Sequence, residues 1–380
     1  MTKQILPLAL LGALAACGGS NSAADLAANA PTYDRLALSQ SDADMTAPAA
    51  APSGSDTVQQ NATTTVDCHP HLFDRSHEIV SRVNRHFFKH LRHVEELIRD
   101  NPKLASAGTA TWESVKNGVD RKLTITATVN SDGSTTYAFE LDIKSTGDFV
   151  KVMDGAITRK GKAPALVENS GTVNFDFTAL HSVLPTERAT GQIQSDFDIV
   201  KDPGKPAPGE KRTATIKLTA FLPEEGDPHG PRTGQYVWER EPAIGGSLEF
   251  QDTVVLLCPS NPTNAPADLI AVARWYHAAG GSIHGRSDAQ ATAGQIPAGD
   301  KWMGVTCAQG QSTSQPAEGY WMVKEEDAGG ITIAGQASTV GTAPCDTLLG
   351  GTPPSVSDNS HDFLFSSVSF SAPYPFPNQW

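Results

Sequence analysis

The chain has 380 residues, a length that suits one large or two medium domains. It carries 29 Lys and Arg against 42 Asp and Glu, so its formal net charge is −13. This acidity argues against nucleic-acid binding, which needs a basic surface, and against electrostatic docking on anionic lipid. Five cysteines in a chain this long exclude a cysteine-dense miniprotein.

The beginning of the chain has the features of an export signal. Lys3 precedes an apolar run from Ile5 to Leu14, and small residues follow the run. The run is too short for a typical transmembrane helix, which needs roughly 20 apolar residues. Residues 1–16 are therefore predicted to be a signal peptide.

The end of this signal is more specific than that of an ordinary one. Leu14-Ala15-Ala16-Cys17 resembles the lipobox of bacterial lipoproteins. The resemblance implies cleavage before Cys17 and acylation of Cys17, which would anchor the chain to a lipid bilayer. Gly18 after the cysteine is similar to the outer-membrane class, so we expect a cell-envelope protein facing the periplasm or the cell surface. The alternative is a plain secretory signal with a chance cysteine.

Four cysteines remain beyond the lipobox: Cys68, Cys258, Cys307 and Cys345. An even number in an exported, oxidising compartment predicts two disulfide bonds with three alternative pairings. We favour Cys307–Cys345, which would join neighbouring C-terminal strands, and Cys68–Cys258, which would tie a helical segment to the body. No C-x-x-C pair is present to favour a metal site instead.

Residues 17–66 are predicted to be a lipid anchor followed by a disordered tether. The segment is rich in Ala, Ser, Asp, Thr and Pro, so it cannot bury enough apolar surface to offset its ordering entropy. The run from Tyr33 to Leu38 is interpreted as part of this tether, with a nascent helix or a partner-binding patch as the alternative.

Residues 67–105 are predicted to form a long amphipathic helix from His71 to Arg99. Apolar residues recur at the helical period on one stripe, and Asn101-Pro102 ends it. The stripe consists of Ile79, Val83, Phe87, Leu91, Val94 and Ile98.

Residues 106–349 are predicted to form an antiparallel β domain that makes one globular unit with the helix. The strongest hairpin spans 122–144, where apolar and polar residues alternate around the turn Ser131-Asp132-Gly133-Ser134. Further strand candidates include Thr172–Ala179 and, in the Pro-rich tail of residues 350–380, Asp362–Ser371. Helices do not alternate with strands, so a parallel α/β fold is not expected. The fold class is mainly β (α+β), with a meander that forms a curled sheet, sandwich or half-barrel.

This layout of lipobox, helix and one-sided strands resembles, in outline, the curled-sheet carriers of the bacterial lipoprotein-localisation system. The resemblance implies one antiparallel sheet folded around helices, with an acyl chain held inside. The side chains expected to line such a ligand cavity are inward-facing residues of the predicted strands. They are Leu123, Ile125, Phe139, Leu141, Phe175 and Phe177.

Histidines gather on the predicted helix. His86, His90 and His93 follow the i, i+4, i+7 pattern, which places them on one side of a helix. Neutral imidazoles at this spacing are suited to Zn²⁺ or Cu²⁺. The alternative, which we prefer, is a pH-sensitive basic face packed on the rim of the sheet.

No catalytic motif is recognisable, so no catalytic residue is assigned and a non-enzymatic protein is expected. The chain lacks H-E-x-x-H, a Walker loop and G-x-G-x-x-G. The expected function is binding of an apolar ligand or of an envelope partner, without nucleic acid and without a cofactor other than the covalent lipid. A surface adhesion module and a metal-binding or hydrolytic protein that uses the helix histidines remain the alternatives.

Overall fold

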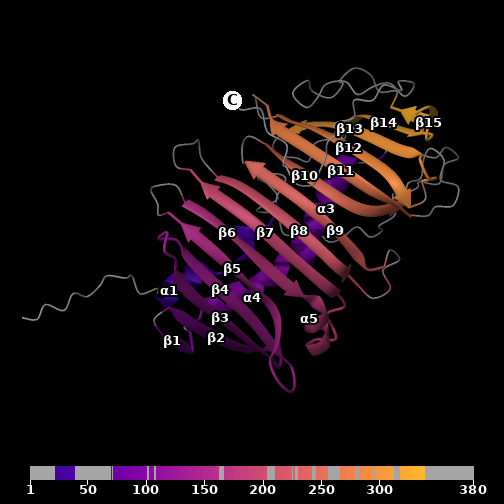
Figure 1. The fold of residues 1–380 in the computed structure, drawn as a ribbon. Helices are drawn as coiled ribbons and strands as arrows, with labels where there is room; N and C mark the ends of the chain where they lie inside the picture. The colour runs from indigo at the N-terminus through magenta and orange to yellow at the C-terminus, as the bar shows by residue number, and fades with distance from the viewer. Residues whose placement is uncertain are drawn as a thin grey trace, which may run out of the picture.

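The architecture is a single antiparallel sheet that curls around helices (Figure 1). The computed structural model describes residues 22–38, 70, 72–100, 102–106, 108–161, 167–202, 210–224, 226, 230–241, 245–255, 266–278, 282–294, 296–311 and 317–338. Within these residues fifteen strands pair strictly in chain order, each with its sequence neighbours. The predicted mainly-β meander is confirmed, in the form of one unclosed curled sheet rather than a sandwich.

The first eight strands form one half of the sheet. They are β1 (Leu104–Ser106), β2 (Thr109–Lys116), β3 (Val119–Val129), β4 (Thr135–Lys144), β5 (Val150–Lys160), β6 (Val167–Asp176), β7 (Thr190–Lys201) and β8 (Glu210–Leu222). The other half contains β9 (Arg232–Glu241), β10 (Gly245–Val255), β11 (Pro266–His277), β12 (Ser282–Gly294), β13 (Lys301–Gln311), β14 (Ala317–Glu326) and β15 (Thr332–Ala337). Register shifts interrupt several strand pairs, for example between Leu141 and Asp142. Such bulges increase local twist and help a sheet to curl.

The helices lie against one face of this sheet, which we call the concave face. α3 (Leu72–His86), the short 3₁₀ turn η2 (Phe88–His90) and α4 (Leu91–Ile98) follow one another along it. α3 contacts β11, β12 and β13, whereas α4 contacts β2. Together they cross nearly the whole width of the sheet, as Figure 1 shows.

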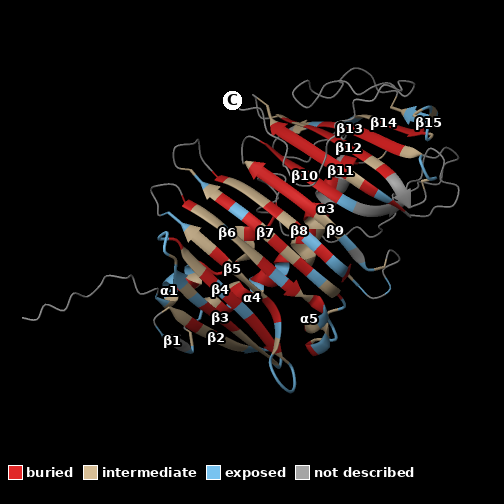
Figure 2. Cartoon of the chain, in the orientation of Figure 1, coloured by how far each residue is buried: buried red, intermediate tan, exposed pale blue. Residues whose placement is uncertain are grey.

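The period-two pattern of the sequence determines which side chains face the helices. Leu123 pairs with Leu141 and Ile125 with Phe139, and all four are buried in the core shared with the helices. Intervening residues such as Thr124 and Glu140 lie on the opposite face, which we call the outer face. In β3–β8 buried and more exposed residues alternate, but several strands of the second half are buried on both faces (Figure 2).

The predicted single helix is interrupted. α3 ends at His86, and η2 follows before α4 begins at Leu91. Phe87 and Phe88 at the break are both fully buried, and their rings are 4.5 Å apart. Two adjacent buried aromatics cannot lie on one narrow helical stripe, so the local change of pitch brings both into the core.

The predicted strand Thr172–Ala179 is wrong in its last three residues. β6 ends at Asp176, and Phe177 begins the helix α5 (Phe177–Val183). The side chain of Asp176 accepts a hydrogen bond from the backbone of Ala179 and thereby caps the helix. This local capping overrides the β pattern of the flanking aromatic residues.

The prediction of a disordered tether over 17–66 is wrong for residues 22–38. They form α1 (Ala23–Ala28) and α2 (Tyr33–Leu36), and Leu26, Leu36 and Leu38 are buried in the main core. Ser22 and Asp25 form a reciprocal capping box that starts α1. Three leucines with a place in the core offset the ordering entropy of this short segment.

Several predictions lie outside the described residues. They are the signal peptide 1–16, Cys17, the rest of the tether, Cys68, Cys258, Cys345 and the strand Asp362–Ser371. Among the helices that the structure describes, none combines the length and the apolar character needed to cross a membrane.

Candidate functional site

The three predicted helix histidines have different surroundings. His90 in η2 is 3% exposed, and its ring centroid lies 4.8 Å from that of Phe175 and 5.4 Å from that of Phe177. Burial lowers the pKa of His90 well below its usual value, and nearby Lys89 adds to this effect. His86 instead lies in a T-shaped arrangement with Phe221, with ring centroids 6.4 Å apart.

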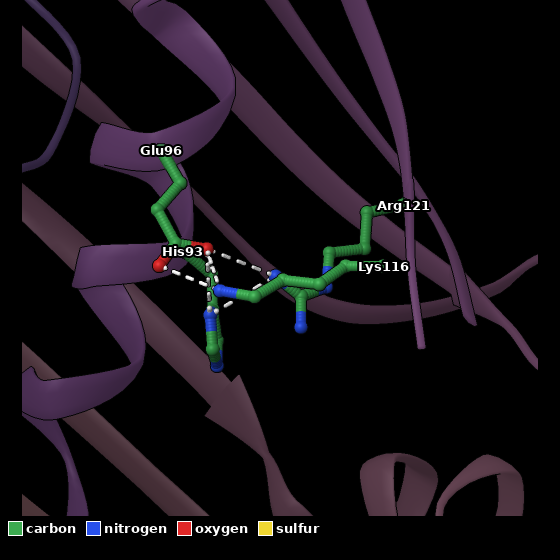
Figure 3. Close-up of polar contacts among 4 residues, drawn as sticks. All are labelled: His93, Glu96, Lys116 and Arg121. Carbon is green, nitrogen blue, oxygen red and sulfur yellow. Dashed lines mark hydrogen bonds and ion pairs between the residues drawn. The ribbon is translucent and has the colours of Figure 1, made fainter. Parts of the chain in front are cut away.

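His93 belongs to a polar cluster that joins α4 to the β2–β3 hairpin (Figure 3). The guanidinium of Arg121 lies 3.2 Å from Nδ1 of His93 and 3.3 Å from Oε2 of Glu96. Lys116 donates to both carboxylate oxygens of Glu96 at 2.9 Å. The carboxylate of Glu96 therefore accepts hydrogen bonds from residues of both β2 and β3. His93 lies one turn before Glu96 on the same helix, α4.

This cluster keeps His93 neutral. Because a guanidinium is only a donor, Nδ1 of His93 must accept the bond and carry no proton. Burial and the charge of Arg121 lower the pKa of His93 to about 4, against the opposing effect of Glu96. The Nδ1 lone pair is already used, so the cluster is an interelement crosslink rather than a base or ligand poised for chemistry.

Where the structure describes the helix side chains, their geometry gives no support to a metal site. The rings of His90 and His93 are 6.0 Å apart and tilted, and each has the other contacts described above. Among the described residues, no group of three or more His, Cys, Asp or Glu side chains is placed to hold a metal ion.

The six residues predicted to line an apolar cavity come together on the concave face. Leu123, Ile125, Phe139, Leu141, Phe175 and Phe177 are all buried in one hydrophobic cluster. The ring of Phe175 contacts that of Phe177 at 4.6 Å and that of Phe87, from the helix side, at 6.4 Å. The chain's own helices thus cover these side chains, and the six residues act as core in this structure.

A second charged cluster, which sequence reasoning missed, lies on the outer face of β10–β14. Nε and Nη2 of Arg286 donate to the carboxylate of Asp288 at 2.8–3.1 Å, and Arg274 approaches the same carboxylate at 3.7 Å. Lys324 pairs with Glu326 at 2.8 Å. All five side chains are almost fully buried. The signal in the sequence is the i, i+2 spacing of opposite charges, which places both on one face of a strand.

Glu249 borders this cluster from β10. It is 3% exposed, and in the described part of the chain its Oε2 makes no hydrogen bond. Burial raises the pKa of Glu249 to about 7; Arg274 opposes the shift and Glu239 adds to it. The protonation of the Glu249 carboxyl group therefore changes near neutral pH.

Of the four cysteines beyond the lipobox, the structure describes Cys307. It is buried in β13 with Met303, Val305 and Met322. The three cysteines that could pair with Cys307 lie outside the described residues. The pairing of the four cysteines therefore stays a prediction.

Comparison of the chain with protein-family models, with curated proteins and with solved structures finds no match. Any assignment of function consequently depends on the chain's own residues and their geometry.

Proposed function

We propose that this chain is a lipid-anchored, non-enzymatic protein of the bacterial cell envelope that binds a polar protein partner through the outer face of its sheet. The observation that carries the choice of partner is the occupation of the concave face. The helices fill it from β2 to β13, and the six candidate ligand residues pack beneath them. The lipobox Leu14-Ala15-Ala16-Cys17 supports the anchor.

The outer face of β2–β8 has the chemistry of a polar recognition surface. Hydroxyl groups pair across strands, as between Thr136 and Thr158 at 2.9 Å. Asp196 accepts from Thr172 at 2.7 Å and from Lys217 at 2.8 Å. These short, mutually hydrogen-bonded side chains are held in place before a partner arrives, which lowers the entropy lost on binding.

The second candidate is the binding of an apolar ligand such as an acyl chain. It is favoured by the resemblance of the layout to curled-sheet carriers and by the concentration of phenylalanine around Phe175. It requires the helix segment to move away from the sheet, because this segment contacts the same side chains that the ligand would contact.

Two measurements on the exported full chain decide between these candidates. Native mass spectrometry of the Cys17→Ser variant should show the protein mass without a co-purified acyl lipid. A photo-crosslinking amino acid at Thr158 on the outer face should capture one defined envelope protein in cells, whereas the same amino acid at exposed Asn117 should not. Stoichiometric acyl lipid, or equal capture from both positions, would contradict the proposal.

We also propose that the exported protein contains the disulfides Cys307–Cys345 and Cys68–Cys258. Peptide mapping without reduction should recover these two linked pairs from the mature chain. Recovery of either of the other two pairings would overturn this assignment without affecting the proposed anchor.

A further inference from the structure

Residues 22–38, which we call the N-terminal strap, are fastened to the folded body. Leu26 of α1 is fully buried, and Leu38 beyond α2 is 2% exposed. The side chain of Asn84 in α3 bonds both the N–H and the carbonyl oxygen of Leu38, the former at 2.8 Å. Glu95 of α4 accepts from the N–H of Tyr33 at 2.7 Å. The strap therefore belongs to the fold.

Arginine side chains attach the strap to the sheet as well. Arg159 of β5 donates to the side chain of Asn29 at 3.2 Å, and Arg212 of β8 donates to the carbonyl oxygen of Arg35 at 3.0 Å. Arg35 itself bonds the carbonyl oxygens of Ala28 and Ala30, at the end of α1. These bonds fix the strap at both of its helices.

The attachment points lie along one edge of the sheet. Arg159 is the penultimate residue of β5, and Arg212 is the third residue of β8. α1 contacts β2 and β3, and Asp25 lies close enough to affect the pKa of Tyr137, near the start of β4. At this edge, which we call the strap edge, the strands β3, β5 and β7 end and the strands β4, β6 and β8 begin. α5 and the β4–β5 loop are at the opposite edge (Figure 1).

We propose that the strap edge is the surface of this protein that faces the membrane. Ser22 follows Cys17 by five residues, and five residues span at most about 18 Å even when fully extended. Because the strap is part of the fold, a lipid on Cys17 holds Ser22, where the strap begins, within that distance of the bilayer and so brings the strap edge toward it. The inference rests on the acylation of Cys17 that we propose above.

In this arrangement the plane of the sheet is roughly perpendicular to the membrane. The strands run away from the bilayer, and the opposite edge lies about 30 Å further out, the length of a ten-residue strand such as β4. The outer face of β2–β8 then stands beside the membrane, accessible to another anchored protein. The covalent lipid imposes the proximity, so no electrostatic attraction by this acidic chain is required.

The test measures the height of two positions above the bilayer. The acylated protein is placed in vesicles of phosphatidylethanolamine and phosphatidylglycerol that contain an acceptor-labelled lipid. A donor dye is attached through a non-natural amino acid at exposed Asp132, in the β3–β4 turn, or at exposed Asp148, in the β4–β5 loop. Energy transfer from position 132 should exceed that from position 148 at least about twofold, because about 30 Å of strand separates the two.

A longer connection provides the matched control. Insertion of about 20 Gly and Ser residues between Gly19 and Ser20 leaves the strap intact and allows the domain to move away as a flexible linker does. Transfer from position 132 should then fall toward that from position 148. Equal transfer from both positions in the natural chain, with Cys17 shown by mass to be acylated, would overturn the membrane-facing edge alone. An unmodified Cys17 would overturn both the anchor and this inference.

Discussion

The side-chain amide of Asn84 makes two hydrogen bonds with the backbone of Leu38, 46 residues away in the sequence. An amide that both accepts from an N–H and donates to a carbonyl reproduces the pairing of a neighbouring strand. In this way one polar residue of α3 holds the end of the strap without a further strand. Leu38 is buried and Asn84 is half-buried, and lost hydrogen bonds are costly where water cannot replace them.

Replacement of Asn84 is expected to loosen the strap. Asn84→Ala removes both bonds and leaves the N–H and carbonyl of Leu38 without them, so the free energy of unfolding should fall by about 1–3 kcal/mol. Urea denaturation measures this change, and hydrogen exchange should show lost protection in residues 22–38. Asn174→Ala removes an exposed bond to Asp154 and should change stability by less than about 0.5 kcal/mol. An effect no larger than that of the control would contradict the assigned role.

The buried His90 predicts a loss of stability in mild acid. Its pKa in the folded protein lies well below the ordinary 6.5, so below pH 6.5 the unfolded chain gains a proton that the folded protein does not. The free energy of unfolding should therefore fall as the pH falls, by up to about 1.4 kcal/mol per pH unit from this residue. His90→Phe should show a shallower decline between pH 7 and 5, whereas exposed Arg99→Gln should keep the original slope. Identical slopes in all three proteins would exclude His90 as the source.

The cluster in Figure 3 predicts opposite shifts of one pKa. Glu96 raises and Arg121 lowers the pKa of His93, which is about 4 in the intact cluster. Glu96→Gln should lower the pKa further, and Arg121→Met should raise it toward 6.5. Titration of the imidazole by NMR of histidine-labelled protein reports both changes. If the two variants shift the pKa in the same direction, the cluster does not control it. Stability itself should change by less than about 1 kcal/mol for Glu96→Gln, because its partners are partly exposed.

Glu249 should have the opposite effect on stability to that of His90. Its pKa is raised to about 7, so between its ordinary value and pH 7 the folded protein keeps a proton that the unfolded chain releases. The free energy of unfolding should fall as the pH rises through this range. In Glu249→Gln this pH-dependent loss of stability should be absent. The free energy of unfolding of the variant minus that of the natural chain should therefore be about 1–3 kcal/mol larger at pH 8 than at pH 5.

Chemical denaturation at both pH values measures the effect of Glu249. Exposed Glu140→Gln is the matched control and should track the natural chain at both pH values. A constant difference between Glu249→Gln and the natural chain across the range would show that the carboxyl group of Glu249 does not titrate there.

Local pattern was sufficient to predict much of the sheet. Alternation around Leu123 and Ile125 predicts their pairing with Leu141 and Phe139, because a strand with one buried face repeats every two residues. The helical stripe through Val83, Leu91 and Val94 is likewise buried as its period requires. At Phe177 the same reasoning fails, because the strand ends and a helix begins there. The helix is capped by one hydrogen bond, from the N–H of Ala179 to the side chain of Asp176. In the sequence, this capping signal is less evident than the alternation of aromatic residues that predicts a strand.

The candidate sites were less predictable than the fold. The spacing of His86, His90 and His93 places them on neighbouring turns, but it carries no information about what packs on them. Phe175 of β6 and Phe177 of α5 contact His90, and Arg121 of β3 contacts His93, and all three are distant from the helix in the sequence. Likewise, the spacing of Arg286 and Asp288 places them on one face of a strand but does not predict that both are buried there.

By itself, the sequence determined the class of fold, the face that the β3–β4 hairpin buries and, through the spacing of Leu14 to Cys17, the expectation of a lipid anchor. These are local properties of composition and period. Only the tertiary structure decided that residues 22–38 are part of the folded body, because their leucines are stabilised by a core built from Leu72 and residues further along the chain. The physical reason is that ordering a short segment costs conformational entropy. With few apolar residues, the segment offsets this cost only by burying them against a complementary surface that the rest of the chain has formed.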